Sequence, residues 1–82
     1  MNRIAVISLI VSERSAAEPL NALLHDYAEH IIGRMGLPVR DRGINLISVA
    51  LDAPQETVSA LAGKLGRLKG VTSKTVYAPE EL

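Results

Sequence analysis

The stretch LPVRDRGINLISVALD, residues 37–52, decides the fold because it predicts two strands joined by a tight turn. Asp41, Arg42 and Gly43 are typical turn residues, and Gly43 is free to adopt a positive φ. Pro38 has no backbone N–H to donate to a sheet, which places the first of the two strands at a sheet edge. We therefore expect a β-hairpin with one edge strand in the middle of the chain.

The chain begins with an apolar, β-branched run, RIAVISLIV (3–11), that ends at the polar SERS. This pattern predicts a buried strand. The run is too short to cross a bilayer, which takes about 20 apolar residues, and Glu13 and Arg14 follow it directly. We therefore expect a strand here and not a secretory leader.

A helical pattern connects this strand to the hairpin. Ser15 and Glu18 have the spacing of a capping box, and the glycines from Gly33 to Gly36 predict the end of the helix. The apolar positions follow the i, i+3, i+4, i+7 series of an amphipathic helix; they are Leu20, Leu23, Leu24, Tyr27, Ala28, Ile31 and Ile32.

A second helix and a last strand follow the hairpin. Asp52 is the candidate N-cap and Pro54 fits the first turn, while GRLKG (66–70) ends the helix and VTSKTVY (71–77) forms the strand. The expected buried stripe of this helix is Val58, Leu61, Ala62 and Leu65. The order βαββαβ predicts an α+β, ferredoxin-like fold, a four-stranded antiparallel sheet with both helices on one face. Eighty-two residues suffice for one such domain, spanning 1–82.

Two helices cover only one face of that sheet, yet the first and third strands are apolar on both faces. Soluble monomers seldom tolerate a large uncovered apolar surface. We therefore expect a homo-oligomer, a dimer or tetramer, built through the spare sheet face or the strand edges.

Composition excludes several functions. Nine basic and nine acidic residues give a formal net charge of zero, which provides no long-range attraction to nucleic acid. The absence of cysteine excludes disulfides, thiolate zinc sites and thiol nucleophiles, and it suits a cytoplasmic protein. No membrane partner and no cofactor are predicted.

The stretch LLHDYAEHIIGRMG (23–36) contains both histidines, but it favours packing over chemistry. On one helix His25 and His30 would project about 140° apart, so they could not chelate one metal. That helix would place His25 beside Glu29 and Asp26 beside His30, so the alternative is a metal bound by His25, Glu29 or His30 with further ligands from another chain. On this helix Tyr27 would pack in the core and Arg34 would be a C-terminal cation favoured by the dipole. No nucleophile, base and orienting group come together, so we predict no enzyme.

Cations gather at one pole of the predicted fold. The end of the first strand, the hairpin turn and the end of the second helix meet there, next to the N-terminus of the first helix. This arrangement predicts a site for a small anion, a carboxylate or a phosphate. The alternative is a set of solvated cations offset by Glu13 and Asp41. The cations are Arg14, Arg40, Arg42, Lys64, Arg67 and Lys69.

The strings IIGRMG (31–36), GINLIS (43–48) and GKLGRLKGV (63–71) resemble a small family of iron-only hydrogenase system regulators. The resemblance implies a ferredoxin-like fold related to amino-acid-binding ACT domains and to the C-terminal domain of nickel-responsive regulators. It also implies homo-oligomers and a regulatory role, which is often assigned by association with hydrogenase maturation functions. The nickel site of those regulators uses cysteine and does not transfer, and no ribbon-helix-helix segment precedes the first strand, so direct DNA binding is not expected.

Taken together, these features predict a ligand-responsive regulatory module. One alternative is a structural adaptor that docks on a partner protein without a small ligand. The other is a small enzyme in which His25 or His30 acts as acid or base.

Overall fold

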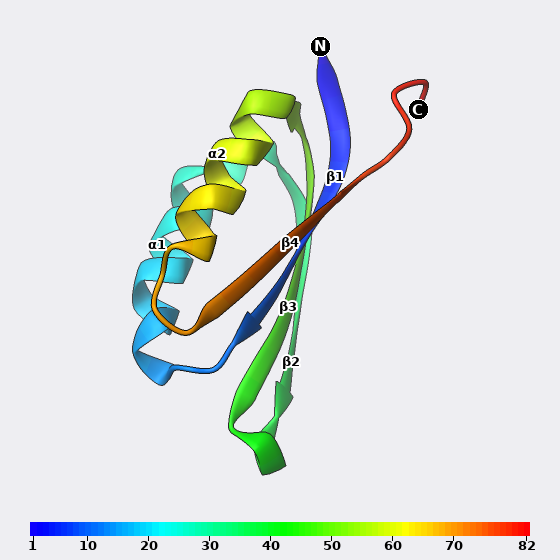
Figure 1. Cartoon of the computed structure of the whole chain (residues 1–82). Coiled ribbons are helices and arrows are strands. Elements are labelled where there is room, and N and C mark those ends of the chain that lie inside the picture. Colours follow the sequence, from blue (N-terminus) through cyan, green and yellow to red (C-terminus); the bar gives the residue numbers. More distant parts are fainter.

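The computed structural model, which describes residues 1–82, is a four-stranded antiparallel sheet with two helices on one face (Figure 1). Three short 3₁₀ turns, η1 (Arg14–Ala16), η2 (Ala28–His30) and η3 (Arg40–Arg42), connect the main elements. The main elements are β1 (Asn2–Val11), α1 (Ala17–Asp26), β2 (Ile31–Val39), β3 (Ile44–Pro54), α2 (Gln55–Gly66) and β4 (Val71–Tyr77). The predicted ferredoxin-like βαββαβ fold is confirmed.

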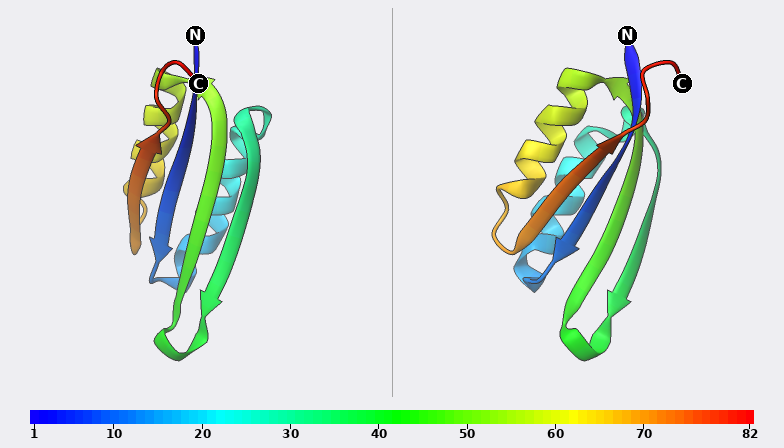
Figure 2. Two further views of the ribbon diagram at one scale, coloured as in Figure 1. Left: turned by 90° about the vertical axis from the view of Figure 1, so that its right-hand side faces the viewer. Right: turned by 45° about the vertical axis from the view of Figure 1, so that its right-hand side comes forward.

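The strand order is β2-β3-β1-β4, so the two longest strands lie at the centre and β2 and β4 are the edges (Figure 2). β1 pairs with β3 from Asn2↔Pro54 to Val11↔Asn45. Pro38 lies in β2, where its missing N–H leaves no gap inside the sheet. The predicted edge position of this proline is therefore confirmed.

The core lies between the helices and one face of the sheet. Strand residues alternate between the two faces, and Ile7, Val49 and Leu51 point to the helices and are completely buried. From α2, Val58, Leu61 and Leu65 are buried against them, as predicted, while Ala62 is half-buried. The core contains 14 buried residues and no buried polar side chain, so apolar packing provides its stability.

The predicted extent of the first helix is wrong. α1 ends at Asp26, and after η2 the chain enters β2 at Ile31. Ile31 pairs with Leu51 of β3 and packs against the core, and a bulge separates it from Gly33. Isoleucine is β-branched and favours strands, so Ile31 and Ile32 satisfy a helical spacing while belonging to the edge strand.

The two predicted side-chain caps are also wrong. Ser15 lies inside η1, α1 is preceded by Ala16, and no side chain caps the helix. Asp52 lies in β3, opposite Ile4, and Pro54 occupies the N-cap position of α2. Strand pairing continues to Pro54, so the ladder extends past the residue that the sequence offers as a cap.

The second face of the sheet has no helix over it, as the left view of Figure 2 shows. The strand register shows that alternate residues of all four strands contribute most of the side chains of this face. We call this surface the open face. Its residues are Ile4, Val6, Ser8 and Ile10 of β1, Met35 and Leu37 of β2, Leu46, Ser48, Ala50 and Asp52 of β3, and Thr72, Lys74 and Val76 of β4.

Two glycines adopt the left-handed conformation at turns. Gly43 closes the β2–β3 hairpin with a φ of 66°, as predicted, and Gly70 precedes β4 with a φ of 80°. The hairpin extends beyond the ends of the helices (Figure 1). Neither α1 nor α2 is long and apolar enough to cross a membrane.

Candidate ligand-binding site

A pocket lies where the β2–β3 hairpin extends past the start of α1. Its volume is about 310 Å³, which is at the lower end of the range for small-molecule sites. Val11 at the end of β1 and Ile44 at the start of β3 contribute apolar walls. Because the hairpin is longer than the helical layer, this part of the sheet has no helix to fill the space beside it.

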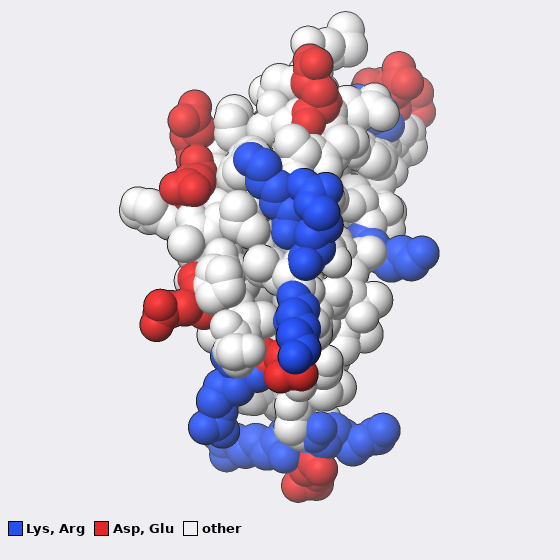
Figure 3. All heavy atoms as spheres, turned by 60° about the vertical axis from the view of Figure 1, so that its left-hand side comes forward, with Lys and Arg blue, Asp and Glu red and all other residues white.

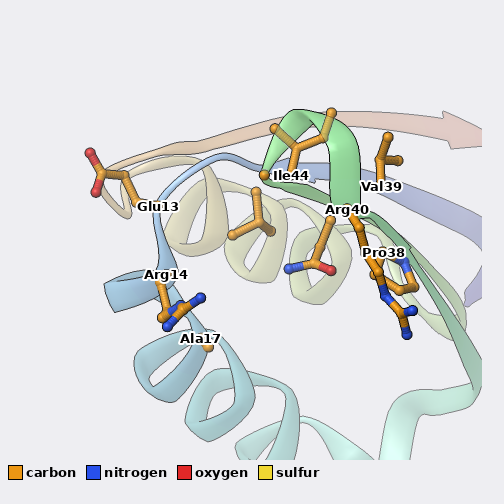
Figure 4. Close-up of a pocket in the computed structure, with 10 residues that line it drawn as sticks. Glu13, Arg14, Ala17, Pro38, Val39, Arg40 and Ile44 are labelled. Atoms are coloured by element: carbon orange, nitrogen blue, oxygen red, sulfur yellow. The ribbon is translucent and has the colours of Figure 1, made fainter.

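Two arginines line this pocket from different elements. Arg14 comes from η1 and Arg40 from η3, and Figure 4 shows their side chains on opposite sides of the space. Ala17, in the first turn of α1, lies next to Arg14 in the same view. The pocket is therefore cationic on two sides and lies at the uncapped start of a helix, whose N-terminus has a partial positive charge.

Neither arginine is neutralised within the chain. The structure contains one Arg–carboxylate ion pair, Arg3 with Glu80 at 4.0 Å, and it is remote from the pocket, as is the contact of Glu29 with His30. The side chains of Arg14 and Arg40 donate no hydrogen bond to another residue. An anion entering the pocket would therefore not have to displace an internal carboxylate.

Glu13 also lines the pocket, but its carboxylate points outward in Figure 4. Its Cβ and Cγ lie against Gly70, where an added Cβ would collide with them. The backbone N–H and the hydroxyl of Ser12 both donate to the Gly70 carbonyl, at 2.8 and 3.2 Å. These contacts fix the loop that carries Arg14 to the turn between α2 and β4.

The other predicted pole cations lie outside the pocket. Figure 3 shows Lys and Arg side chains in a band over the helical face and at the hairpin end. Lys64 donates to the hydroxyl of Tyr27 at 2.9 Å and lies 5.2 Å from its ring centroid. The remaining three, Arg42, Arg67 and Lys69, are exposed and do not line the pocket.

Several pocket residues carry no signal in the sequence. The strand register explains why three of them line the pocket. Asn45 pairs with Val11 of β1 and with Pro38 of β2, and Ile44 precedes Asn45 in the chain. Nothing in their residue types indicates a ligand. Only the expected closeness of the hairpin turn to the end of β1 could have suggested them.

The two histidines lie on different elements. His25 is in the last turn of α1 and His30 is in η2, where its Nε2 lies 4.0 Å from Glu29. No group of three or more histidine and acidic residues could hold a metal ion. The prediction that both histidines lie on one helix is wrong, because His30 lies beyond the end of α1.

The prediction that Tyr27 and Arg34 lie on one long helix is also wrong. Tyr27 follows α1 directly and packs against the core, as predicted, although it is only half-buried. Arg34 lies on β2, so it is not the C-terminal cation of a helix. Its Nη1 donates to Oδ1 of Asn21 at 3.0 Å and thereby connects the edge strand to α1.

Comparison with known proteins agrees with this architecture. The model of the TM1266-like family, described as "Iron-only hydrogenase system regulator, putative", matches residues 3–75. The chain belongs to this family. The TM1266-like match covers every strand at least in part and both helices, so the family assignment rests on the whole fold.

Two solved structures show similar folds. The uncharacterized protein TM1266 from Thermotoga maritima is 35% identical, with a TM-score of 0.92 over 96% of this chain and 100% of its own. A formyltetrahydrofolate deformylase from Pseudomonas putida KT2440 is 13% identical, with a TM-score of 0.65 over 93% of this chain and 29% of its own. The second likeness concerns the fold alone. No curated protein matches this chain.

Proposed function

We propose that this protein is a cytoplasmic, homo-oligomeric regulatory module of an iron-only hydrogenase system, and that it binds a small anion between Arg14 and Arg40. The observation that carries the proposal is a pocket of about 310 Å³ lined by two arginines without internal partners. The family description supports the regulatory role. The ligand class is a small carboxylate or phosphate compound.

The chemistry of the pocket supports an anion in particular. Guanidinium groups bind carboxylate and phosphate oxygens with paired, charge-assisted hydrogen bonds. Val11 and Ile44 add apolar surface, which suits a ligand with a short carbon skeleton. Binding is the proposed activity, and catalysis is not part of it, because no nucleophile and base lie together among the residues that line the pocket.

The test is a ligand titration at constant ionic strength, because surface charges respond to salt as well. Inorganic phosphate and acetate are titrated separately while thermal unfolding is followed. A ligand at about 100 times its Kd stabilises the folded state by about 2.7 kcal/mol. We expect one of the two anions to raise the Tm saturably.

Variants then locate the site. Arg14→Ala and Arg40→Ala each remove a charge-assisted bond of about 1.5–3 kcal/mol, so each should weaken binding about tenfold or more. Arg67→Ala is the matched control, an exposed arginine outside the pocket, and should leave the Kd unchanged. A Tm that no anion raises, or equal losses in all three variants, would contradict the proposal.

A second candidate function is an adaptor that docks on a partner protein without a small ligand. The exposed apolar residues of the open face favour it, since Met35, Leu37 and Val76 are each more than half exposed. The same anion titration distinguishes the two candidate functions. An adaptor would show no anion-dependent Tm shift and would copurify with a specific protein.

A further inference from the structure

The open face contains a hollow next to a projecting side chain. The hollow has a volume of about 260 Å³, and its lining includes Gly33, Ser48 and Ala50, which are small enough to leave the space unfilled. Met35 of β2 also lines the hollow at its border, and its side chain projects beside it, 71% exposed. Methionine is unbranched and flexible, so it adapts well to an irregular apolar cavity.

The surroundings of the hollow suit an apolar insertion. Arg34 is the one charged residue in its lining, and its guanidinium is bound to Asn21 of α1. The two charged residues of the open face itself are Asp52, paired with Ile4 toward the end of β3, and Lys74 on the opposite edge strand. A methionine entering the hollow would therefore replace water and would not displace an ion pair.

A single surface that carries both a projection and a matching hollow is self-complementary. A two-fold dimer requires this property, because residue i of one copy must contact residue j of the other and the reverse must also hold. Two sheets that pack face to face also interdigitate side chains in this manner, about 10 Å apart. The chain thus supplies both halves of the contact.

We propose that a second copy of this chain covers the open face, and that Met35 of each copy inserts into the hollow lined by Gly33, Ser48 and Ala50 of its partner. This inference rests on the oligomeric part of the proposed function and specifies its surface. In this arrangement the two copies do not contact each other through their strand edges, the alternative interface expected from the sequence.

Sedimentation equilibrium of the full chain over a range of concentrations tests the proposal. The wild type is expected to be a dimer. Met35→Glu puts a carboxylate into each hollow, whose one cation, Arg34, is already bound to Asn21, and should weaken the dimer at least about 100-fold. Ala50→Leu leaves Met35 in place but fills the hollow, and it should also shift the equilibrium to monomer.

Ala60→Glu is the matched control. Ala60 is exposed on α2, on the helical side of the sheet and outside the open face. It should change the dimer Kd less than about tenfold. Circular dichroism at low concentration checks that each variant folds, which the exposure of Met35 leads us to expect.

The outcomes separate this inference from the broader proposal. A wild type that is monomeric at every concentration would overturn both the interface and the oligomeric part of the proposed function. An oligomer that survives Met35→Glu and Ala50→Leu would overturn the interface alone. Equal weakening by Ala60→Glu and Met35→Glu would overturn the assignment of the interface to the open face.

Discussion

The two faces of the sheet have similar residues and opposite environments. On the covered face, Ile7, Val49 and Leu51 have no exposed surface, whereas Met35 and Leu37 on the open face are 71% and 61% exposed. Strands that are apolar on both faces are typical of sheets buried on both sides. The sequence of these strands therefore fits a sheet with two layers over it, while the chain itself supplies only one.

The largest expected effect comes from two leucines of β3 that point to opposite faces. Leu51 is fully buried and Leu46 is 36% exposed. Leu51→Ala should lower the free energy of unfolding by about 2–5 kcal/mol, because it leaves a cavity in the core. Leu46→Ala should cost about 1 kcal/mol or less in the monomer. Chemical denaturation at low protein concentration measures both.

The same measurements at high protein concentration test whether a second copy covers the open face. If a second copy covers the open face, the cost of Leu46→Ala grows with concentration, since the interface then contributes to stability. The cost of Leu51→Ala stays nearly constant. A Leu46→Ala effect that is as large as that of Leu51→Ala in dilute solution would contradict the assignment of the two faces.

A smaller effect is expected from two glycines at turns, Gly70 beside the covered side and Gly43 at the free hairpin tip. Both have positive φ, so alanine at either position pays a strain of about 1–2 kcal/mol. An alanine Cβ at Gly70 would also collide with Glu13, whereas nothing lies within 4 Å at Gly43. Gly70→Ala should therefore cost about 1–3 kcal/mol more than Gly43→Ala. Thermal unfolding of the two variants measures the difference, and equal losses would argue against the contact between Glu13 and Gly70.

Periodicity in the sequence predicted most of the fold, and it failed where one pattern fitted two structures. The alternating strands and the stripe of Val58, Leu61 and Leu65 were found correctly, because their burial follows from spacing alone. Ile31 and Ile32 continue a helical series, yet they belong to a strand. Pairing with Leu51 across the sheet decided between the two, and that contact is not visible in local sequence.

The candidate site was predicted only as a region. Topology alone brings Arg14 and Arg40 to one pole, and the structure adds a pocket between them. Lys64 was expected to join them, but its side chain contacts Tyr27, just after α1, instead. Side-chain direction and the length of the hairpin decide which cations meet, and neither follows from composition or spacing.

The most direct test of a covered open face uses the two methionines of the chain as reporters. Met1 is fully exposed and Met35 is 71% exposed in a single copy, so hydrogen peroxide should convert both to sulfoxide at similar rates in dilute protein. Mass spectrometry of the peptides follows each rate as the protein concentration rises. We predict that oxidation of Met35 slows while that of Met1 stays constant. Equal rates for both methionines at every concentration would contradict a dimer through the open face.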